Sequence, residues 1–596
     1  MLDASRCKNK ATSKSFSRQN MGRRTLLPLL CGSLLYGVAL SACGGEEPGN
    51  AVSDVTAAAA DAIALKKDSP IDTPFSLKGA QAVDLDAVLA LIPEAVRPSY
   101  GSATFDEKRG AMVVTDLKFA PRVDVTLESG DASFQGAGLT AARAEIYGLD
   151  PDALKRIDEA VIEGQARYRA DFEDVLVKMR LFDIEQATDT EQSATDEASQ
   201  TAVGALEFDG LAIRLGAFGG VEEGVDANAA HFFNSFKLKG LYLKDISVAS
   251  KDDSASSPSV RFSAPDVRYS GLGAGRLDAF VARNLKVTTA QSEETIKAAR
   301  DSLGGVLKGP VGSVLSAGTQ TYTFDVFNWQ NIDFSKLMPF ALAGDTPPTT
   351  ERDLIDLGSI RVTGAETLIN GKLFSRAEET SVSAIEATWL IPSRIDAKTP
   401  KITYDFTAYL GDNDTEALDV LTQNGLNNLT GSSNFLYQWN ADSGDLSLAT
   451  DFNAKDFTDL DFSMGLAGLQ LEDLAKAPEL QIEDVFSDLG LSSLNLVIDD
   501  EKMLDAIFAI AALQTGGDAG TVRSQGSALV RVGAMQAMLI NPKLADYANA
   551  IASFMEKGGR LAVKAAPEAP VSFSKLNPGS VATLPQDLNL TVEHSE

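Results

Sequence analysis

Apolar and polar residues alternate with a period of two in four long segments of the chain. Their apolar members are Phe236, Leu238, Tyr242, Ile246 and Val248; Leu277, Ala279, Val281, Leu285 and Val287; Ile402, Tyr404, Phe406, Ala408 and Leu410; and Leu460, Phe462, Met464 and Leu466. Such alternation predicts strands with one buried and one polar face. Strands of this kind are typical of antiparallel sheets that face solvent or a ligand groove on one side.

A helical period separates these strands at several places. The predicted helices cover Asp84–Ile92, Pro151–Met179, Glu293–Leu303 and Thr415–Leu421. We therefore expect a β-dominated α+β protein with antiparallel, curved sheets and with helices packed on one side.

Helical signals become stronger towards the C-terminus. After a strand at Leu494–Ile498, the pair Asp499-Asp500 can cap a helix. Its apolar stripe is formed by Leu504, Ile507, Phe508 and Ala511. A second helix is expected to begin near Pro542 and to end at Gly558-Gly559. The stripe of this second helix is formed by Leu544, Tyr547, Ile551 and Met555. We interpret both stripes as core packing.

The N-terminal segment has the order of an export signal. The basic pair Arg23-Arg24 precedes an apolar run, and small residues precede Cys43. The last four residues, Leu40-Ser41-Ala42-Cys43, resemble the lipobox of bacterial lipoproteins. This resemblance implies that residues 1–42 are removed and that the Cys43 thiol carries a lipid. An ordinary signal peptide with a coincidental cysteine is the alternative.

Two details bear on this signal. Met21 would begin a signal of normal length, so we expect it to be the true start. Arg23-Arg24 also resembles part of a twin-arginine signal. Of the three cysteines, Cys7 and Cys31 lie in the segment that would be removed, which leaves Cys43 as the sole thiol.

Composition divides the remaining chain into regions. We expect a flexible tether over 43–80, an α/β region over 81–184, an acidic linker or loop over 185–203, a β-rich region over 204–345 and an α+β region over 346–596. The tether would hold the body away from a lipid surface.

The charge of the chain excludes nucleic acid as a partner. The net charge is −30, and removal of residues 1–42, with seven Lys or Arg and one Asp, makes it −36. Nucleic-acid phosphates require a basic face instead.

The residues needed for common catalysis are scarce. The chain has two histidines, His231 and His594, and no Gly-x-Ser-x-Gly motif. We therefore predict no catalytic residues and no cofactor. A hydrolase that uses carboxylates alone stays as an alternative.

Metal and phosphate sites are also poorly supported by the sequence. Zinc sites need Cys or His ligands. The segment Asp412–Glu416 offers oxygen ligands for calcium, but Ala417 and Gln423 stand where an EF-hand loop needs Gly and Glu. The glycine-rich segments Gly216–Gly224 and Gly271–Gly275 lack the Lys that follows in a phosphate loop. We predict no metal site.

Two segments of the body resemble a known family. Ser433–Leu469 contains the pattern Tyr437-x-Trp439-x(4)-Gly444-Asp445-Leu446, and Leu494–Phe508 runs from a strand into an apolar helix. Both are similar to the long β segments of AsmA-like periplasmic proteins of Gram-negative bacteria. The resemblance implies an envelope protein whose sheet shelters lipid or a protein client on its apolar face.

The sequence thus leads to three functional hypotheses. The first is a non-catalytic envelope lipoprotein that binds a lipid or protein partner on a β-rich surface. The others are a surface-displayed structural lipoprotein and the carboxylate-dependent hydrolase. Gly44, rather than Asp, follows Cys43, so we expect anchoring in the outer membrane, facing the periplasm. Multiple acylation, including palmitate, would make this anchor stable.

Overall fold

The computed structural model describes residues 82–90, 97–119, 122–127, 130–135, 138–147, 177–187, 200–213, 236–249, 259–273, 275–290, 319–343, 345–411, 414–476, 489–575 and 582–596. All of them belong to one compact unit of the chain, 42–596. Cys43, the tether, His231 and the helix expected at Glu293–Leu303 lie outside the described residues.

Nineteen of the described strands form one sheet. The first nine are β1 (Ser102–Asp106), β2 (Ala111–Phe119), β5 (Gly138–Tyr147), β6 (Val177–Ala187), β7 (Gln200–Ile213), β8 (Phe236–Ala249), β9 (Ser259–Gly273), β10 (Arg276–Ala290) and β11 (Thr319–Asp333). The other ten are β12 (Ser359–Ile369), β13 (Lys372–Thr388), β14 (Ile391–Tyr404), β15 (Leu429–Asn440), β16 (Asp445–Ala454), β17 (Thr458–Ala467), β18 (Gly490–Asp500), β19 (Gly559–Ala565), β20 (Val571–Ser572) and β21 (Thr591–Ser595).

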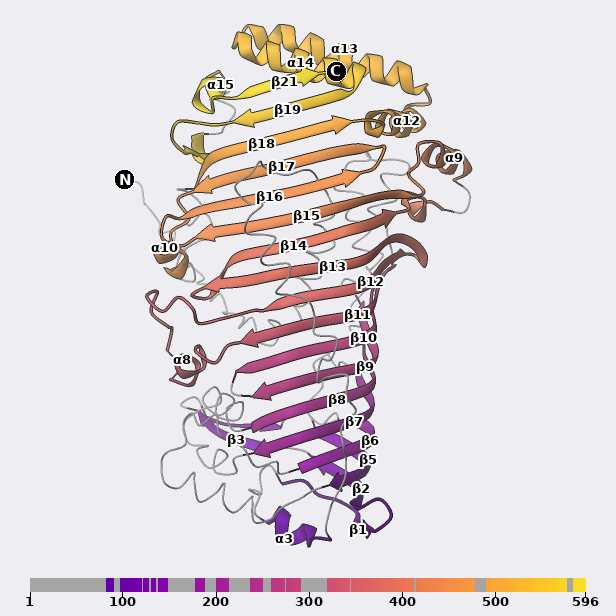
Figure 1. The fold of residues 1–596 in the computed structure, drawn as a ribbon, viewed down its shortest axis with the longest axis vertical. Helices are drawn as coiled ribbons and strands as arrows, with labels where there is room; N and C mark the ends of the chain where they lie inside the picture. The colour runs from indigo at the N-terminus through magenta and orange to yellow at the C-terminus, as the bar shows by residue number, and fades with distance from the viewer. Residues whose placement is uncertain are drawn as a thin grey trace, which may run out of the picture. The chain divides into compact units, whose positions relative to one another are not determined.

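The strands follow one another in the sheet almost in chain order. Every pairing is antiparallel, from β1–β2 and β2–β5 through each successive neighbour to β18–β19 and β19–β21, while β20 pairs with β18 (Figure 1). A separate hairpin joins β3 (Arg122–Leu127) to β4 (Gly130–Gln135). The pairing of β11 with β12 crosses the expected boundary at 345 without a break in the sheet.

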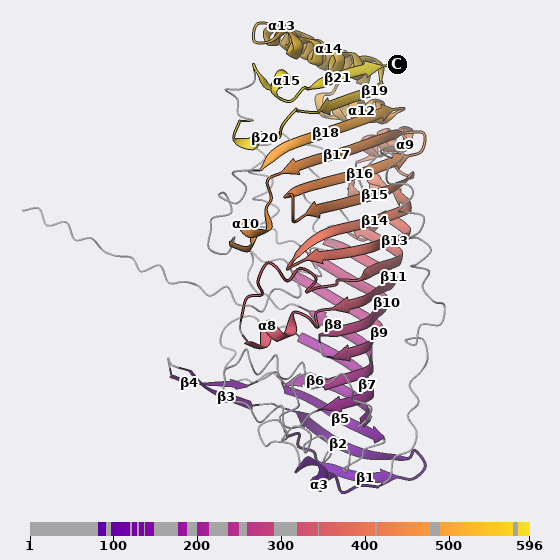
Figure 2. The same cartoon turned by 60° about the vertical axis from the view of Figure 1, so that its left-hand side comes forward.

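The helices gather towards the C-terminus, as Figure 2 also shows. They are α3 (Leu85–Leu89), α8 (Met338–Ala343), α9 (Thr415–Gln423), α10 (Leu471–Lys476), α12 (Met503–Thr515), α13 (Ala519–Met538), α14 (Pro542–Lys557) and α15 (Leu584–Asp587). The prediction of a β-dominated, antiparallel α+β fold with helices concentrated near the C-terminus is therefore confirmed.

Local chemistry sets the predicted helix ends. The Asp500 carboxylate accepts a hydrogen bond from the Leu504 N–H at 2.9 Å at the start of α12. The helix α14 begins at Pro542 and ends before Gly558, whose φ of 73° favours glycine. One part of the predicted α12 stripe is wrong, because Ile507 is exposed rather than packed in the core.

Three predicted segments need correction. The C-terminal end of the helix expected at Pro151–Met179 is wrong, because β6 begins at Val177. Residues 185–187 and 200–203 of the expected acidic linker belong to β6 and β7, while 188–199 lie outside the described residues. The strand expected at 402–410 ends at Tyr404, because the Asp405 carboxylate caps the 3₁₀ helix η7 (Phe406–Tyr409).

A line of left-handed residues interrupts the strands in their middle. The residues are Asp116, Asp245, Asn284 and Gly364, with φ angles of 50°, 51°, 49° and 60°. Near this line, side chains three positions apart face the same way: Leu181 and Ile184 share one hydrophobic cluster. Regular alternation would place them on opposite faces. We call this feature the bend line.

The bend line overturns the simple alternation expected for β10. Ala279 and Val281 are buried on one face, but Ala282 and Leu285 are buried as well. Ala282 directly follows Val281, so the two side chains point to opposite faces. This strand therefore has apolar residues on both faces.

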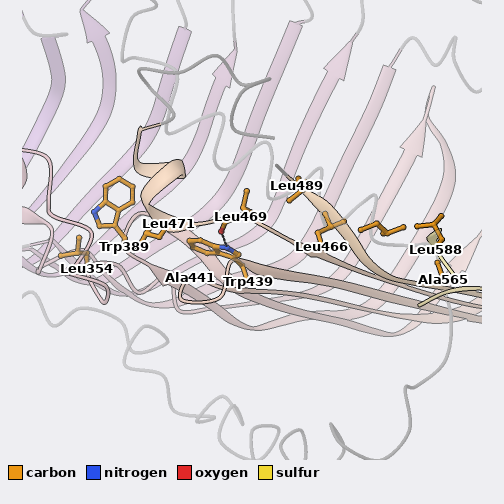
Figure 3. Packing of buried hydrophobic residues seen from close by; sticks show 11 residues of the cluster. Leu354, Trp389, Trp439, Ala441, Leu466, Leu469, Leu471, Leu489, Ala565 and Leu588 are labelled. Atoms are coloured by element: carbon orange, nitrogen blue, oxygen red, sulfur yellow. Dashed lines mark hydrogen bonds between the residues drawn. The ribbon is translucent and has the colours of Figure 1, made fainter. Parts of the chain in front are cut away.

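A tryptophan core lies on the C-terminal strands (Figure 3). Trp439 is 4% exposed, and its Nε1 donates a hydrogen bond to the Leu469 carbonyl at 2.9 Å. Trp389 is buried nearby and donates to the Pro347 carbonyl at 2.9 Å. Leu471 of α10 is fully buried in the same cluster. A buried indole with a satisfied N–H contributes its full apolar area to stability.

A second cluster lies beneath two helices. Leu421 of α9 and Ala506 of α12 are buried against Tyr404 and Phe452, whose ring centroids are 6.3 Å apart. The apolar face of these strands is therefore covered by helices.

Candidate binding surface

A row of large side chains crosses strands β8–β11 on one face of the sheet. The strand register pairs Leu241 with Tyr269, Tyr269 with Phe280, and Phe280 with Trp329. The rings of Tyr269 and Phe280 have centroids 4.9 Å apart. All four side chains are half-buried. We call these four residues the aromatic row.

Further apolar side chains extend the aromatic row in both directions. Phe327 of β11 contacts Phe280, with ring centroids 5.8 Å apart, and also Phe324 at 6.3 Å. On the other side, Leu241 pairs with Phe208. Phe208 in turn pairs with Met179. Apolar side chains thus follow one another across six strands, and the first two, Met179 and Phe208, belong to the cluster that contains Leu85 of α3.

The N–H of the one tryptophan in the aromatic row is already satisfied. Trp329 Nε1 donates a hydrogen bond to the Leu357 carbonyl at 2.6 Å. The indole ring is therefore held in place while part of its apolar surface stays exposed. Such a ring offers contact area without an unsatisfied polar group.

Helices cover the apolar face on both sides of the aromatic row in the strand order. Leu85 of α3 is buried in the cluster that Phe208 joins, and α9 and α12 cover the cluster around Tyr404. The aromatic row belongs to neither cluster. This part of the face is thus the best candidate for a binding surface among the described residues.

The opposite face of strands β5–β9 carries a charged row. The register pairs Glu145 with Arg180, Arg180 with Glu207, Glu207 with Tyr242, and Tyr242 with Arg268. Arg180 Nε lies 3.1 Å from Glu207 Oε1. Opposite charges on directly facing positions stabilise an antiparallel pair. The two faces of the sheet therefore differ sharply in chemistry.

Glu145 lies at the centre of an ion-pair network. Its side chain is 4% exposed, and its Oε1 accepts hydrogen bonds from Arg109 Nη1, at 2.9 Å, and from Arg143. Tyr147 donates its hydroxyl to Oε2 at 2.7 Å, and burial followed by this bond raises the pKa of Tyr147 to about 12. Tyr147 therefore stays a proton donor at neutral pH. These partners give Glu145 a structural role, and the network does not favour a hydrolase.

The predicted chemical residues do not assemble into a site. His594 lies in β21, where its Nε2 is 2.8 Å from the Gly558 carbonyl oxygen and its ring contacts Phe554. Asp414 of the possible calcium segment accepts a hydrogen bond from the Gly411 N–H at 2.8 Å in a turn before α9, and residues 412–413 lie outside the described residues. The segment Gly216–Gly224 also lies outside them.

Gly271 lies near the end of β9 and Gly275 lies in the turn between β9 and β10, with φ angles of 63° and 78°. Within the part of the chain that the structure describes, no three His, Cys, Asp or Glu side chains are grouped to hold a metal ion. None of the described helices has the length and hydropathy needed to span a membrane.

The aromatic row is not predicted by the sequence. The alternation in β10 predicts a buried face made of residues with odd numbers, whereas Phe280 lies on the other face. The available signal was the number of aromatic residues between Tyr269 and Trp329. Their alignment depends on strand pairing, which local patterns do not give.

Comparison with known proteins adds one match. Residues 451–595 match a family model described as "Uncharacterized protein". A comparison with curated proteins finds no match. The matched residues run from within β16 to the end of β21 and include α12, α13 and α14. Over this C-terminal segment the chain is similar to an uncharacterized protein family.

Proposed function

We propose that this protein is a non-catalytic lipoprotein of the bacterial cell envelope that binds a lipid or protein partner on its β-rich surface. The observation that carries the proposal is the aromatic row. Its partly exposed apolar side chains lie next to one another on neighbouring strands, and apolar patches on a surface commonly mark binding sites.

The dimensions of the row favour an elongated apolar ligand. The four side chains from Leu241 to Trp329 lie on successive strands. At the usual strand spacing these four positions extend over about 14 Å. One leaflet of a bilayer has hydrocarbon about 15 Å thick, so an acyl chain can lie along the row. The first candidate for the partner is therefore a lipid, consistent with the resemblance to AsmA-like proteins.

Lipid binding can be tested by native purification of the protein with Cys43→Ser, followed by mass spectrometry of co-purifying lipids. We expect bound lipid in this protein and a marked loss of it in Phe280→Asn. Phe573→Asn is the matched control, because Phe573 is 42% exposed and lies outside the aromatic row. A protein that purifies without lipid would contradict the lipid form of the proposal.

A protein partner is tested separately by a photo-crosslinking residue at Tyr269 in living cells. We expect a discrete crosslinked adduct at Tyr269 and none at Tyr409, which is a tyrosine in η7. If neither lipid nor an adduct is found, the binding proposal fails and a structural display function takes its place.

The anchor itself is tested by fractionation. Cys43→Ser should abolish labelling with palmitate and lower the share of the protein in the membrane fraction. Protease treatment of intact cells then distinguishes the two orientations: protection supports a periplasmic protein, and digestion supports surface display.

A further inference from the structure

The helix α13 has its large apolar residues on the outside. Small residues of α13 face its neighbours, since Ser527 and Ala534 are buried and a Cβ at Gly526 would lie 3.2 Å from Met555. Arg523 also faces inwards and lies over the Phe508 ring. Leu529, by contrast, is 73% exposed, and Met535 is 69% exposed. A surface helix ordinarily shows the reverse pattern.

The exposed apolar residues continue into the turn that joins α13 to α14. The full set, with exposed fractions, is Leu529 (73%), Val532 (53%), Met535 (69%), Met538 (60%), Leu539 (89%) and Ile540 (57%). We call this set the α13 tip. Connecting turns are normally polar because they face water. An apolar turn next to an apolar helix face therefore requires a partner.

The turn is firmly built rather than loosely attached. Asn541 is 6% exposed, and its Nδ2 donates hydrogen bonds to the Ala582 carbonyl at 2.7 Å and to Gln586 Oε1 at 3.0 Å. Its Oδ1 accepts a hydrogen bond from the Lys543 N–H at 3.0 Å. These contacts fix Leu539 and Ile540 in their exposed positions.

The charge around the α13 tip differs from that of the whole chain. No Asp or Glu occurs between Ala519 and Ala545, in a chain with 83 acidic residues, whereas Arg523, Arg531 and Lys543 lie in this stretch. Arg523 pairs with Asp505, and Arg531 forms an exposed pair with Glu556. Exposed pairs of this kind are weak and are readily exchanged for other anions.

We propose that the α13 tip inserts into the surface of a phospholipid bilayer that contains anionic lipids. The apolar side chains would enter the boundary between headgroups and acyl chains, and Arg531 and Lys543 would contact lipid phosphates. A second copy of the chain fits less well, because a symmetric contact between two tips would bring Arg531 and Lys543 of one copy close to the same residues of the other. This contact is separate from the aromatic row and from Cys43.

The test uses the full chain with Cys7, Cys31 and Cys43 replaced by Ser, so that one new cysteine carries an environment-sensitive fluorophore. The label is placed in Met535→Cys, in Leu539→Cys and, as a matched control, in Glu416→Cys on α9, where Glu416 is exposed. Each protein is mixed with vesicles of phosphatidylethanolamine and phosphatidylglycerol, and with vesicles of phosphatidylcholine alone.

We expect a blue shift and a gain in emission at Met535→Cys and Leu539→Cys with the anionic vesicles, and quenching by lipids with brominated acyl chains. The shift should be smaller with phosphatidylcholine, and Glu416→Cys should not respond. Adding Leu539→Glu to the labelled Met535→Cys protein should abolish its fluorescence response to vesicles. The fold should stay intact, because Leu539 is 89% exposed and makes little contact with the body.

Three results would overturn the proposal. No response at either tip position with any vesicle means that the tip does not insert. A blue shift without vesicles that grows with protein concentration identifies an interface between copies. A blue shift without vesicles that is independent of concentration shows that another segment of this chain covers the tip.

Discussion

Strands β8–β11 and β14–β18 are built in the same way but differ in what lies on their apolar face. Both groups are antiparallel neighbours in one sheet, and both contain a tryptophan whose N–H donates to a main-chain carbonyl. Trp439 is buried in a cluster that includes a residue of α10, whereas Trp329 in the aromatic row is half-buried. The same kind of apolar sheet face is thus covered as core in one strand group and left partly exposed in the other, and the covering elements decide which.

The largest effect is expected from Trp439→Ala. Removal of a buried aromatic side chain should lower the free energy of unfolding by about 3–5 kcal/mol, because it leaves a cavity in the tryptophan core. Chemical denaturation of the variant and the parent protein measures this loss. A loss as small as that of a surface substitution would mean that β14–β18 are not a true core.

Gly364→Ala is expected to be the next most damaging change. Gly364 lies on the bend line with a φ of 60°, and an added Cβ would lie 2.0 Å from Asp325 Oδ2. We expect a loss of about 2–3 kcal/mol from backbone strain and crowding. Gly371→Ala is the control for strain alone, since Gly371 has a φ of 82° and nothing within 4 Å of its Cβ position. Equal losses would show that the contact with Asp325 is unimportant.

Trp329→Ala tests the aromatic row directly. Because Trp329 is half-buried, we expect a loss of only about 1–2 kcal/mol in the free energy of unfolding. Lipid binding should decline much more than stability does. If denaturation shows a loss as large as that of Trp439→Ala, the aromatic row is core and the contrast between the two strand groups disappears.

Asp500→Asn should give the smallest effect, and one that depends on pH. Burial raises the pKa of Asp500, even though the Leu504 N–H opposes the shift. The folded protein therefore holds this proton more tightly than the unfolded chain. The contribution of the carboxyl to stability is present at low pH and is lost as the pH rises through the raised pKa.

An amide at position 500 keeps a cap acceptor but carries no charge. We compare the thermal midpoint of Asp500→Asn with that of the parent at two pH values. The difference, variant minus parent, should be larger at pH 7 than at pH 3.5, because the parent carboxyl is protonated at the lower pH. A relative midpoint that does not change between these two pH values would show that burial of this charge has no energetic consequence.

The sequence alone was enough to predict features that depend on residues close together in the chain. The start of α14 at Pro542 and its end before Gly558 follow from local backbone chemistry, and β17 follows from its alternation. The aromatic row was missed for a physical reason. Phe280 meets Tyr269 and Trp329 only through strand register, and the left-handed residue Asn284 shifts the faces within the same strand.

The nearly sequential order of the sheet has a consequence for how this protein can vary in length. From β6 to β18 each strand bonds to the strands directly before and after it in the chain. An insertion of one hairpin would therefore separate two neighbours and pair with both, while every other register stays unchanged. Relatives can gain or lose strands in pairs, and each pair would change the span of the sheet by about 10 Å. The length of the sheet across its strands would then change in steps of one hairpin.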